Sequence, residues 1–109
     1  MDLQPGENAI DTWTLLYTPP AGGSYNGKLT ITNRRLLYDA KWDASVLGTL
    51  GNRAASGQLV IDKSDIAKVE VQKKLLSKKA ILTLADGSVH VFSYGAMNID
   101  KVVAAIEAR

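Results

Sequence analysis

The stretch from Leu29 to Asp39, LTITNRRLLYD, constrains the fold more than any other part of the sequence. Two runs of β-favouring residues flank Asn33-Arg34, and asparagine tolerates the positive φ angle that a two-residue hairpin turn requires. With this turn, the hairpin has one apolar face and an opposite-charge pair on its other face. A shift of the strand register by one residue would lose both. The facing pairs are Leu29 with Tyr38, Ile31 with Leu36, Thr30 with Leu37, and Lys28 with Asp39.

Two arginines, Arg34 and Arg35, follow one another at this turn. Charged side chains at hairpin turns are commonly solvated and need no ligand. We therefore interpret both arginines as solubilising turn residues, and a role in binding an anion is the alternative.

The length of 109 residues suits one domain with a single modest core, so we assign residues 1–109 to one domain, with residues 1–11 as a lead-in. The net charge of +2 does not by itself indicate a nucleic-acid partner, and the few aromatic residues do not interleave with basic ones. There is no cysteine, which excludes disulfides and thiolate metal sites. No apolar run reaches the ~20 residues of a transmembrane helix, and the acidic lead-in lacks the apolar core of a signal peptide. A cytoplasmic location is therefore expected.

Five more segments are rich in β-favouring residues, and turn-forming residues separate them. The segment Thr18–Gly27 is predicted to be a loop because of its prolines and glycines, and Asp62–Ile66 is predicted to be a turn. For Lys41–Gly57 we expect a structured flap or an irregular hairpin, since its apolar residues offer surface to bury. The further predicted strands are Thr12–Tyr17, Gln58–Asp62, Ala67–Lys73, Ala80–Leu84 and Val89–Ser93.

The pair Asp86-Gly87 is a strong signal for a two-residue hairpin turn between the last two strands. In the predicted strand Ala67–Lys73, which precedes these two strands, Val69 and Val71 alternate with charged residues. This alternation predicts that both valines lie on a half-buried face. The turn would set the facing pairs Leu84 with Val89, Leu82 with Val91, Ile81 with Phe92, and Thr83 with His90.

The end of the chain is predicted to be an amphipathic helix from Asn98 onward. Asn98 is a favourable N-cap, and Met97 with Val102 would form a hydrophobic staple around it. One apolar stripe indicates that the helix packs on the sheet. The residues expected in that stripe are Ile99, Val102, Val103 and Ile106.

Seven strands followed by one helix, together with three sequence motifs, resemble the pleckstrin-homology superfold, and within it GRAM-like and bacterial pleckstrin-homology-like domains. The motifs are GKLTITNRRLLYD, LVIDKSDIAKVEV and AILTLADGSVHVF, and the resemblance covers roughly residues 8–109. It implies a mainly β fold with one C-terminal α-helix. The seven strands would form a part-open barrel of two nearly orthogonal antiparallel sheets, capped by the helix.

The resemblance also implies a binding or scaffolding module, because this superfold is rarely catalytic. Members that bind phosphoinositides carry lysines and arginines across the first two strands and their loop. Here the loop Thr18–Gly27 has no basic residue, and Lys28 stands alone after it. The sequence therefore departs from the pattern of the usual inositol-phosphate pocket.

No catalytic or metal site is expected. The single histidine, His90, lies in a predicted strand, where a structural or surface role is the simpler interpretation. Asp62 and Asp65 lie in a short turn that lacks the acid and glycine pattern of a calcium loop. We therefore predict a protein that is not an enzyme and has no cofactor.

The segment Lys73–Lys79, KKLLSKK, is the candidate binding site, and we call it the tip because it should join two strands. The lysines would attract the tip to an anionic membrane surface, and the leucines could then enter the headgroup region. Each lysine near the leaflet contributes ~1 kcal/mol, and each leucine that becomes fully buried contributes roughly 1.5–3 kcal/mol to this weak docking. Alternatively, the lysines flank an apolar pair that packs on the flap or on a subunit, and prevent edge-to-edge aggregation. The candidate residues are Lys73, Lys74, Leu75, Leu76, Lys78 and Lys79.

Two function classes follow from these observations. The first is a binding or adaptor module that docks weakly on an anionic membrane surface or an anionic ligand, peripheral to the membrane. The second is a protein-interaction or self-association module without a lipid ligand, acting as a homo-oligomer through an exposed strand edge. In an alternating meander, the tip, the flap and the loop Thr18–Gly27 would share one rim with Lys41 and Arg53, and Arg34-Arg35 would lie at the other end.

Overall fold

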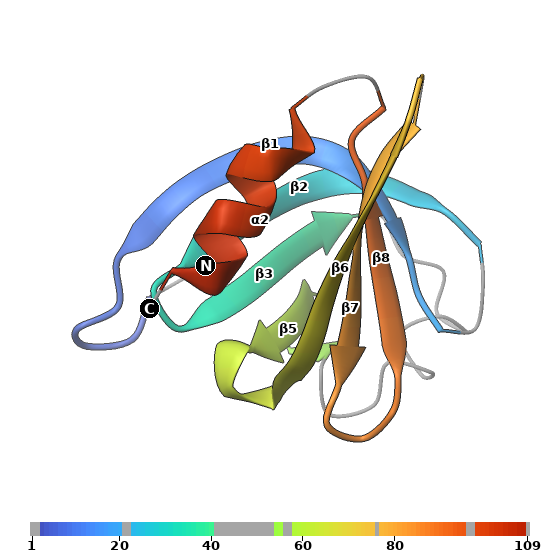
Figure 1. Cartoon of the computed structure of the whole chain (residues 1–109). Helices are drawn as coiled ribbons and strands as arrows, with labels where there is room; N and C mark the ends of the chain where they lie inside the picture. Colours follow the sequence, from blue (N-terminus) through green and yellow to red (C-terminus); the bar gives the residue numbers. More distant parts are fainter. Residues whose placement is uncertain are drawn as a thin grey trace.

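The structure is a computed structural model that describes residues 3–20, 23–40, 54–55, 58–75, 77–95 and 98–108. These residues form one antiparallel sheet and a C-terminal α-helix that packs on it (Figure 1). A short 3-10 helix, η2 (Lys63–Asp65), precedes β6, and the C-terminal helix is α2 (Ile99–Glu107). The strands are β1 (Ala9–Thr18), β2 (Tyr25–Thr32), β3 (Arg35–Ala40), β4 (Ala54–Ala55), β5 (Gln58–Asp62), β6 (Ile66–Lys74), β7 (Ser77–Leu84) and β8 (Val89–Ser93).

The coarse fold prediction is confirmed: the protein is mainly β, with seven antiparallel strands of five residues or more in the described part and one C-terminal helix. The two-residue β4 is an eighth strand in the order β4-β5-β3-β2-β1-β8-β7-β6. The hydrogen-bonded order is continuous, so the sheet does not divide clearly into two. The predicted flap lies outside the described residues except for β4.

The first strand joins the two halves of the sheet. It pairs with β2 from Ala9 to Tyr17, but with β8 only from Leu16 to Thr18. The N-terminal part of β1 therefore does not pair with β8. Figure 1 shows that β6, β7 and β8 run at a steep angle to β1, β2 and β3. Because β1 begins at Ala9, the end of the predicted lead-in is strand, and the loop predicted from Thr18 to Gly27 is shorter because β2 begins at Tyr25.

The β2–β3 hairpin has the predicted register, including Lys28 opposite Asp39 and Ile31 opposite Leu36. Its turn is held by Thr32, whose hydroxyl oxygen accepts hydrogen bonds from the backbone N–H groups of Arg34 and Arg35. The apolar face lies in the core, where Leu29, Ile31, Leu36 and Tyr38 are buried.

The predicted register of the β7–β8 hairpin is wrong by one residue. The observed pairs are Leu82 with His90 and Ile81 with Val91. Gly87 has φ of 87° and its N–H donates to the carbonyl of Leu84, while the N–H of Leu84 donates to the carbonyl of Ser88. The connection is therefore a three-residue loop with its glycine in the left-handed region, a common alternative to the two-residue turn.

The prediction for β6 is only partly confirmed. Val69 is partly buried against the core, but Val71 is 39% exposed. The register of β6 against β7 shifts between Ile66 and Lys68, as at a β-bulge, and such an irregularity twists the edge of a sheet. The C-terminal half of β6, which contains Val71, therefore lies away from the core.

The helix begins as predicted. The side chain of Asn98 accepts a hydrogen bond from the N–H of Asp100 at 3.0 Å. Of the predicted stripe, Val103 is only partly buried, and Ala105 is buried in addition. Met97 of the predicted staple and the last residue, Arg109, lie outside the described residues. The stripe residues Ile99, Val102 and Ile106 are buried in the core.

The other end of α2 is held by Lys63, whose side chain is buried. Its Nζ donates to the carbonyl oxygen of Ala105 at 2.7 Å and to that of Ala108. The segment predicted as a turn is thus the 3-10 helix η2, and it places a cation at the helix C-terminus, where the unpaired carbonyls and the dipole favour positive charge.

We expect Lys63→Met to lower the free energy of unfolding by about 1–2 kcal/mol, because the helix loses a partly buried cation at its C-terminus. Methionine keeps the apolar length of the side chain, so the loss reports on the ammonium group. Urea unfolding followed by circular dichroism measures it. Ser64→Ala, which changes the exposed neighbour, is the control, and equal stability of the two variants would contradict the proposed role of the ammonium.

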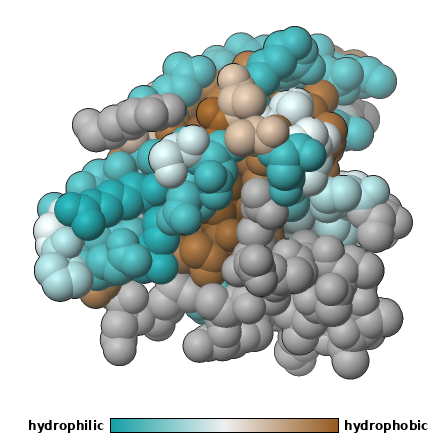
Figure 2. Space-filling model, turned by 90° about the horizontal axis from the view of Figure 1, so that it is seen from below, coloured by the Kyte–Doolittle hydropathy of each residue, from teal (hydrophilic) through white to brown (hydrophobic). Residues whose placement is uncertain are grey.

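Figure 2 shows the molecule from below the view of Figure 1. Apolar residues are visible there between two hydrophilic regions, next to residues drawn in grey. Apolar side chains of the described residues are therefore visible on this side.

Candidate functional site

The predicted tip is confirmed as the connection between β6 and β7. Lys73 faces Lys78 and Lys74 faces Ser77, so lysines flank the turn on both strands. Leu75 lies at the apex and is 89% exposed. Leu76 lies outside the described residues. An apolar side chain thus projects from a basic hairpin end.

The four lysines of the tip differ in their surroundings. The Nζ of Lys73 donates to Oδ2 of Asp100 at 2.8 Å, and both side chains are at least half exposed. Such exposed ion pairs contribute about 0–1 kcal/mol, so Lys73 can exchange this carboxylate for another anion at little cost. Lys74 is exposed, whereas Lys78 and Lys79 are partly buried. Lys73 and Lys74 therefore offer the most accessible charge beside Leu75.

The predicted rim is wrong, because the loop after β1 does not lie with the tip. Thr18 pairs with Val91 and Leu16 with Ser93, so β1 continues past Thr18 toward the N-terminal end of β8. That end adjoins the β7–β8 turn, whereas the tip lies at the opposite end of β7. Because the sheet bends, its successive connections do not simply alternate between two ends, as they would in a flat meander. Lys41 and Arg53 lie outside the described residues.

The interpretation of the two arginines is wrong for Arg35 and stays a prediction for Arg34. Arg34 is exposed, but Arg35 forms a two-pronged ion pair with Glu7. Its Nε lies 2.9 Å from Oε2 of Glu7, and its Nη2 lies 2.7 Å from Oε1. The Glu7 side chain is fully buried and that of Arg35 is 12% exposed, so Arg35 is a structural residue.

Further hydrogen bonds fix the carboxylate of Glu7. The Thr32 hydroxyl donates to Oε2 at 2.6 Å, and the backbone N–H of Gln4 donates to Oε1 at 2.8 Å. The Arg35 guanidinium, helped by these two donors and opposed by burial, lowers the pKa of Glu7 from 4.5 to about 2. The bond to Glu7 also raises the pKa of Arg35. Sequence reasoning missed Glu7 because nothing near it in the chain indicates a partner 28 residues away.

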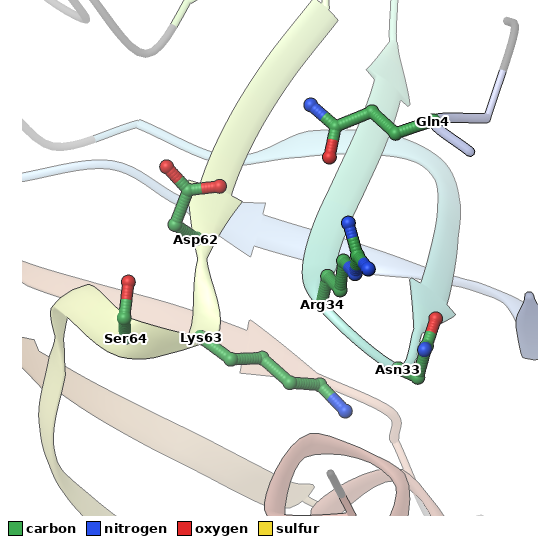
Figure 3. A pocket seen from close by; sticks show the side chains of 6 residues that line it. All are labelled: Gln4, Asn33, Arg34, Asp62, Lys63 and Ser64. Atoms are coloured by element: carbon green, nitrogen blue, oxygen red, sulfur yellow. The ribbon is translucent and has the colours of Figure 1, made fainter. Parts of the chain in front are cut away.

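A depression of about 340 Å³ lies beside this hairpin turn (Figure 3). In Figure 3, Arg34 and Gln4 lie on one side of it, and Asp62 lies on the other. The side chain of Lys63 points away toward α2, whose carbonyls it binds. The depression combines an exposed cation with an acidic side chain, so we assign no anion site to it. Its lining residues are Gln4, Asn33, Arg34, Asp62, Lys63 and Ser64.

The single histidine is structural. His90 is buried, its Nδ1 lies 2.5 Å from the hydroxyl of Tyr17, and its Nε2 lies 3.1 Å from Oγ of Ser88. That Ser88 hydroxyl also donates to Oδ1 of Asp86 at 2.6 Å, which ties the histidine to its own hairpin turn. The one-residue change of register explains why His90 faces inward.

Among the described residues, no group of three or more histidine, aspartate or glutamate side chains could hold a metal ion. No described helix is long and apolar enough to cross a membrane.

No protein-family model matches the sequence, and no curated protein matches it. Among solved structures, a similar one is the crystal structure of the C-terminal domain of an unknown protein from Leishmania infantum. The two chains share 14% identical residues and a TM-score of 0.68, and the match covers 94% of this chain and 83% of that one. At this identity the likeness shows a common fold and nothing of function.

Proposed function

We propose that the chain is a pleckstrin-homology-like, GRAM-like domain, whose bent sheet forms a part-open barrel of two nearly orthogonal halves. The assignment is supported by β1, which pairs along its length with β2 and over three residues with β8. It is also supported by α2, which contacts strands of both halves: β1 and β2 on one side, β6 and β7 on the other.

We propose further that this domain is a non-catalytic binding module that docks on anionic membrane surfaces through its tip. The observation that carries the proposal is Leu75, which is 89% exposed at the apex of a hairpin whose strands end in lysines. A leucine so exposed gains nothing from the fold of its own chain. An environment that is apolar inside and anionic at its surface suits it, and a bilayer rich in acidic lipids has both properties.

The docking would proceed in two physical steps. Lysines near the leaflet are attracted with ~1 kcal/mol each, and burial of Leu75 among the acyl chains adds roughly 1.5–3 kcal/mol. The sum is small, so the binding is weak, reversible and sensitive to salt, because the attraction is screened over about 10 Å at moderate ionic strength. Lys73 would exchange Asp100 for a lipid phosphate.

Co-sedimentation with vesicles tests this proposal. The protein should bind vesicles rich in phosphatidylserine at low salt, release them at high salt, and ignore vesicles of phosphatidylcholine alone. The double reversal Lys74→Glu with Lys78→Glu should weaken binding at least about tenfold, since each lysine contributes ~1 kcal/mol and its replacement repels the surface. Leu75→Ser should weaken binding at low salt, because it removes the apolar contribution.

The matched control is Arg34→Glu, an exposed charge reversal away from the tip, which should bind as the parent does. Arg35 is unsuitable as a control because its reversal breaks the pair with Glu7. Circular dichroism checks that each variant is folded. Equal loss of binding in Arg34→Glu and in the tip variants would contradict the site, and a parent that ignores acidic vesicles would contradict the function.

A further inference from the structure

The strand β6 ends the sheet within the described part of the chain. Its nine residues, Ile66–Lys74, pair with β7 on one side, and no other described strand pairs with them. An edge strand presents unpaired N–H and C=O groups that can pair with another chain. What joins this edge depends on the side chains beside it.

The side chains of β6 are self-complementary. Lys68 and Glu70 lie on the same face of the strand, with Nζ and Oε1 2.5 Å apart, and both are about half exposed or more. Between them, Val69 points to the other face and packs against the core. The charges are therefore placed symmetrically about Val69, and Val71 beyond them is an exposed apolar residue.

We propose that the edge of β6 binds the same edge of a second copy of this chain, antiparallel, about a two-fold axis at Val69. In this register Lys68 of each copy faces Glu70 of the other, and each lysine then has two carboxylate neighbours. Val69 faces its own counterpart on the opposite side of the joined sheet. Cross-strand pairs of opposite charge stabilise an antiparallel sheet, and like charges that face each other destabilise it.

Neighbouring two-fold registers are disfavoured by the same residues. An axis at Lys68 would place two lysines face to face, and an axis at Glu70 would place two glutamates face to face. A shift by a single residue would turn the charged face of one copy to the apolar side of the other. Of these neighbouring registers, only the one with its axis at Val69 sets opposite charges face to face.

The shape of the edge supports this register. A groove of about 180 Å³ lies where α2 approaches the start of β6, and Ile66, Val69 and Ile106 contribute its apolar lining. In the proposed pairing, Val71 of the second copy lies opposite Ala67 and beside this groove. The pairing therefore covers Val71, the exposed large apolar side chain of β6.

This inference is separate from membrane docking and is tested without lipid. In sedimentation equilibrium the parent should show a concentration-dependent monomer–dimer equilibrium. Either single reversal, Lys68→Glu or Glu70→Lys, sets like charges opposite each other twice per dimer and should raise the dimer dissociation constant at least about tenfold. The double swap, Lys68→Glu with Glu70→Lys, restores opposite pairs and should return the constant to within about threefold of the parent.

An equal mixture of the two single variants should form a heterodimer, because one brings two negative side chains and the other two positive ones. Arg34→Glu is the matched control and should dimerise as the parent does. The proposal is overturned if the parent stays monomeric at every concentration. It is also overturned if the single reversals dimerise normally, or if the swap and the mixture fail to restore the dimer.

Discussion

Glu7→Gln should lower the free energy of unfolding by about 3 kcal/mol, because it leaves the guanidinium of Arg35 largely buried without its charged partner. Glutamine has nearly the same shape, but it carries no charge and cannot accept both guanidinium bonds. The bonds from Thr32 and Gln4 would also lose their charged acceptor. Urea unfolding at neutral pH, followed by circular dichroism, measures the change.

The control for this variant is Arg34→Ala, which removes the exposed arginine beside Arg35 and should change stability by less than about 0.5 kcal/mol. A Glu7→Gln protein as stable as the control would show that the pair contributes nothing net.

The carboxyl group of Glu7 should also make the free energy of unfolding fall as the pH becomes acidic. The pKa of Glu7 is lowered from 4.5 to about 2 in the folded protein, so its stabilisation is present in full above pH 4.5. As the pH falls from 4.5 toward 2, Glu7 is protonated more readily in the unfolded chain, and the stabilisation is lost. The parent should lose stability over this range, and Glu7→Gln should lack this part of the loss.

Gly27→Ala should destabilise the protein by about 2–3 kcal/mol, in the upper range of overpacking substitutions. A Cβ at this position would lie 2.2 Å from the backbone oxygen of Asp39 and 2.9 Å from Cβ of Ala40. Backbone atoms of a paired strand cannot move aside as a flexible side chain can, so β2 and β3 would have to separate locally. Urea unfolding at neutral pH measures the effect.

The neighbouring substitution Asn26→Ala is the control for Gly27, since Asn26 is exposed in the same strand and should tolerate the change within about 0.5 kcal/mol. If Gly27→Ala is no less stable than this control, the close approach of the two strands does not limit residue size.

Local features of the fold could be predicted from the sequence. The register of the β2–β3 hairpin follows from a short turn and an alternating pattern, and both lie within a few residues. The cap at Asn98 and the exposed apex at Leu75 are local for the same reason. The β7–β8 register was missed because Asp86-Gly87 fits both a two-residue and a three-residue loop.

Features that join distant parts of the chain could not be predicted. Glu7 and Arg35 are 28 residues apart, and no pattern in either segment indicates the pair. The position of the tip relative to the other loops depends on where β1 leaves β8, which is set by the bend of the whole sheet. The residues of the tip could therefore be predicted, but their neighbours in space could not.

The way β1 joins the sheet has a mechanical consequence. The strands before η2 and the strands after it are two consecutive stretches of chain. Among the described residues, the pairing between them is limited to Leu16–Thr18 with Val91–Ser93. The helix α2 follows β8 in the sequence and contacts strands of both stretches. Because the two stretches share little backbone pairing, side chains hold them together: the ring of Phe92 packs against Tyr17 and Tyr38, and α2 packs against both stretches. The tip and the free edge of β6 both belong to the stretch β6–β8, so their position relative to β1–β5 depends on these side-chain contacts more than on strand pairing.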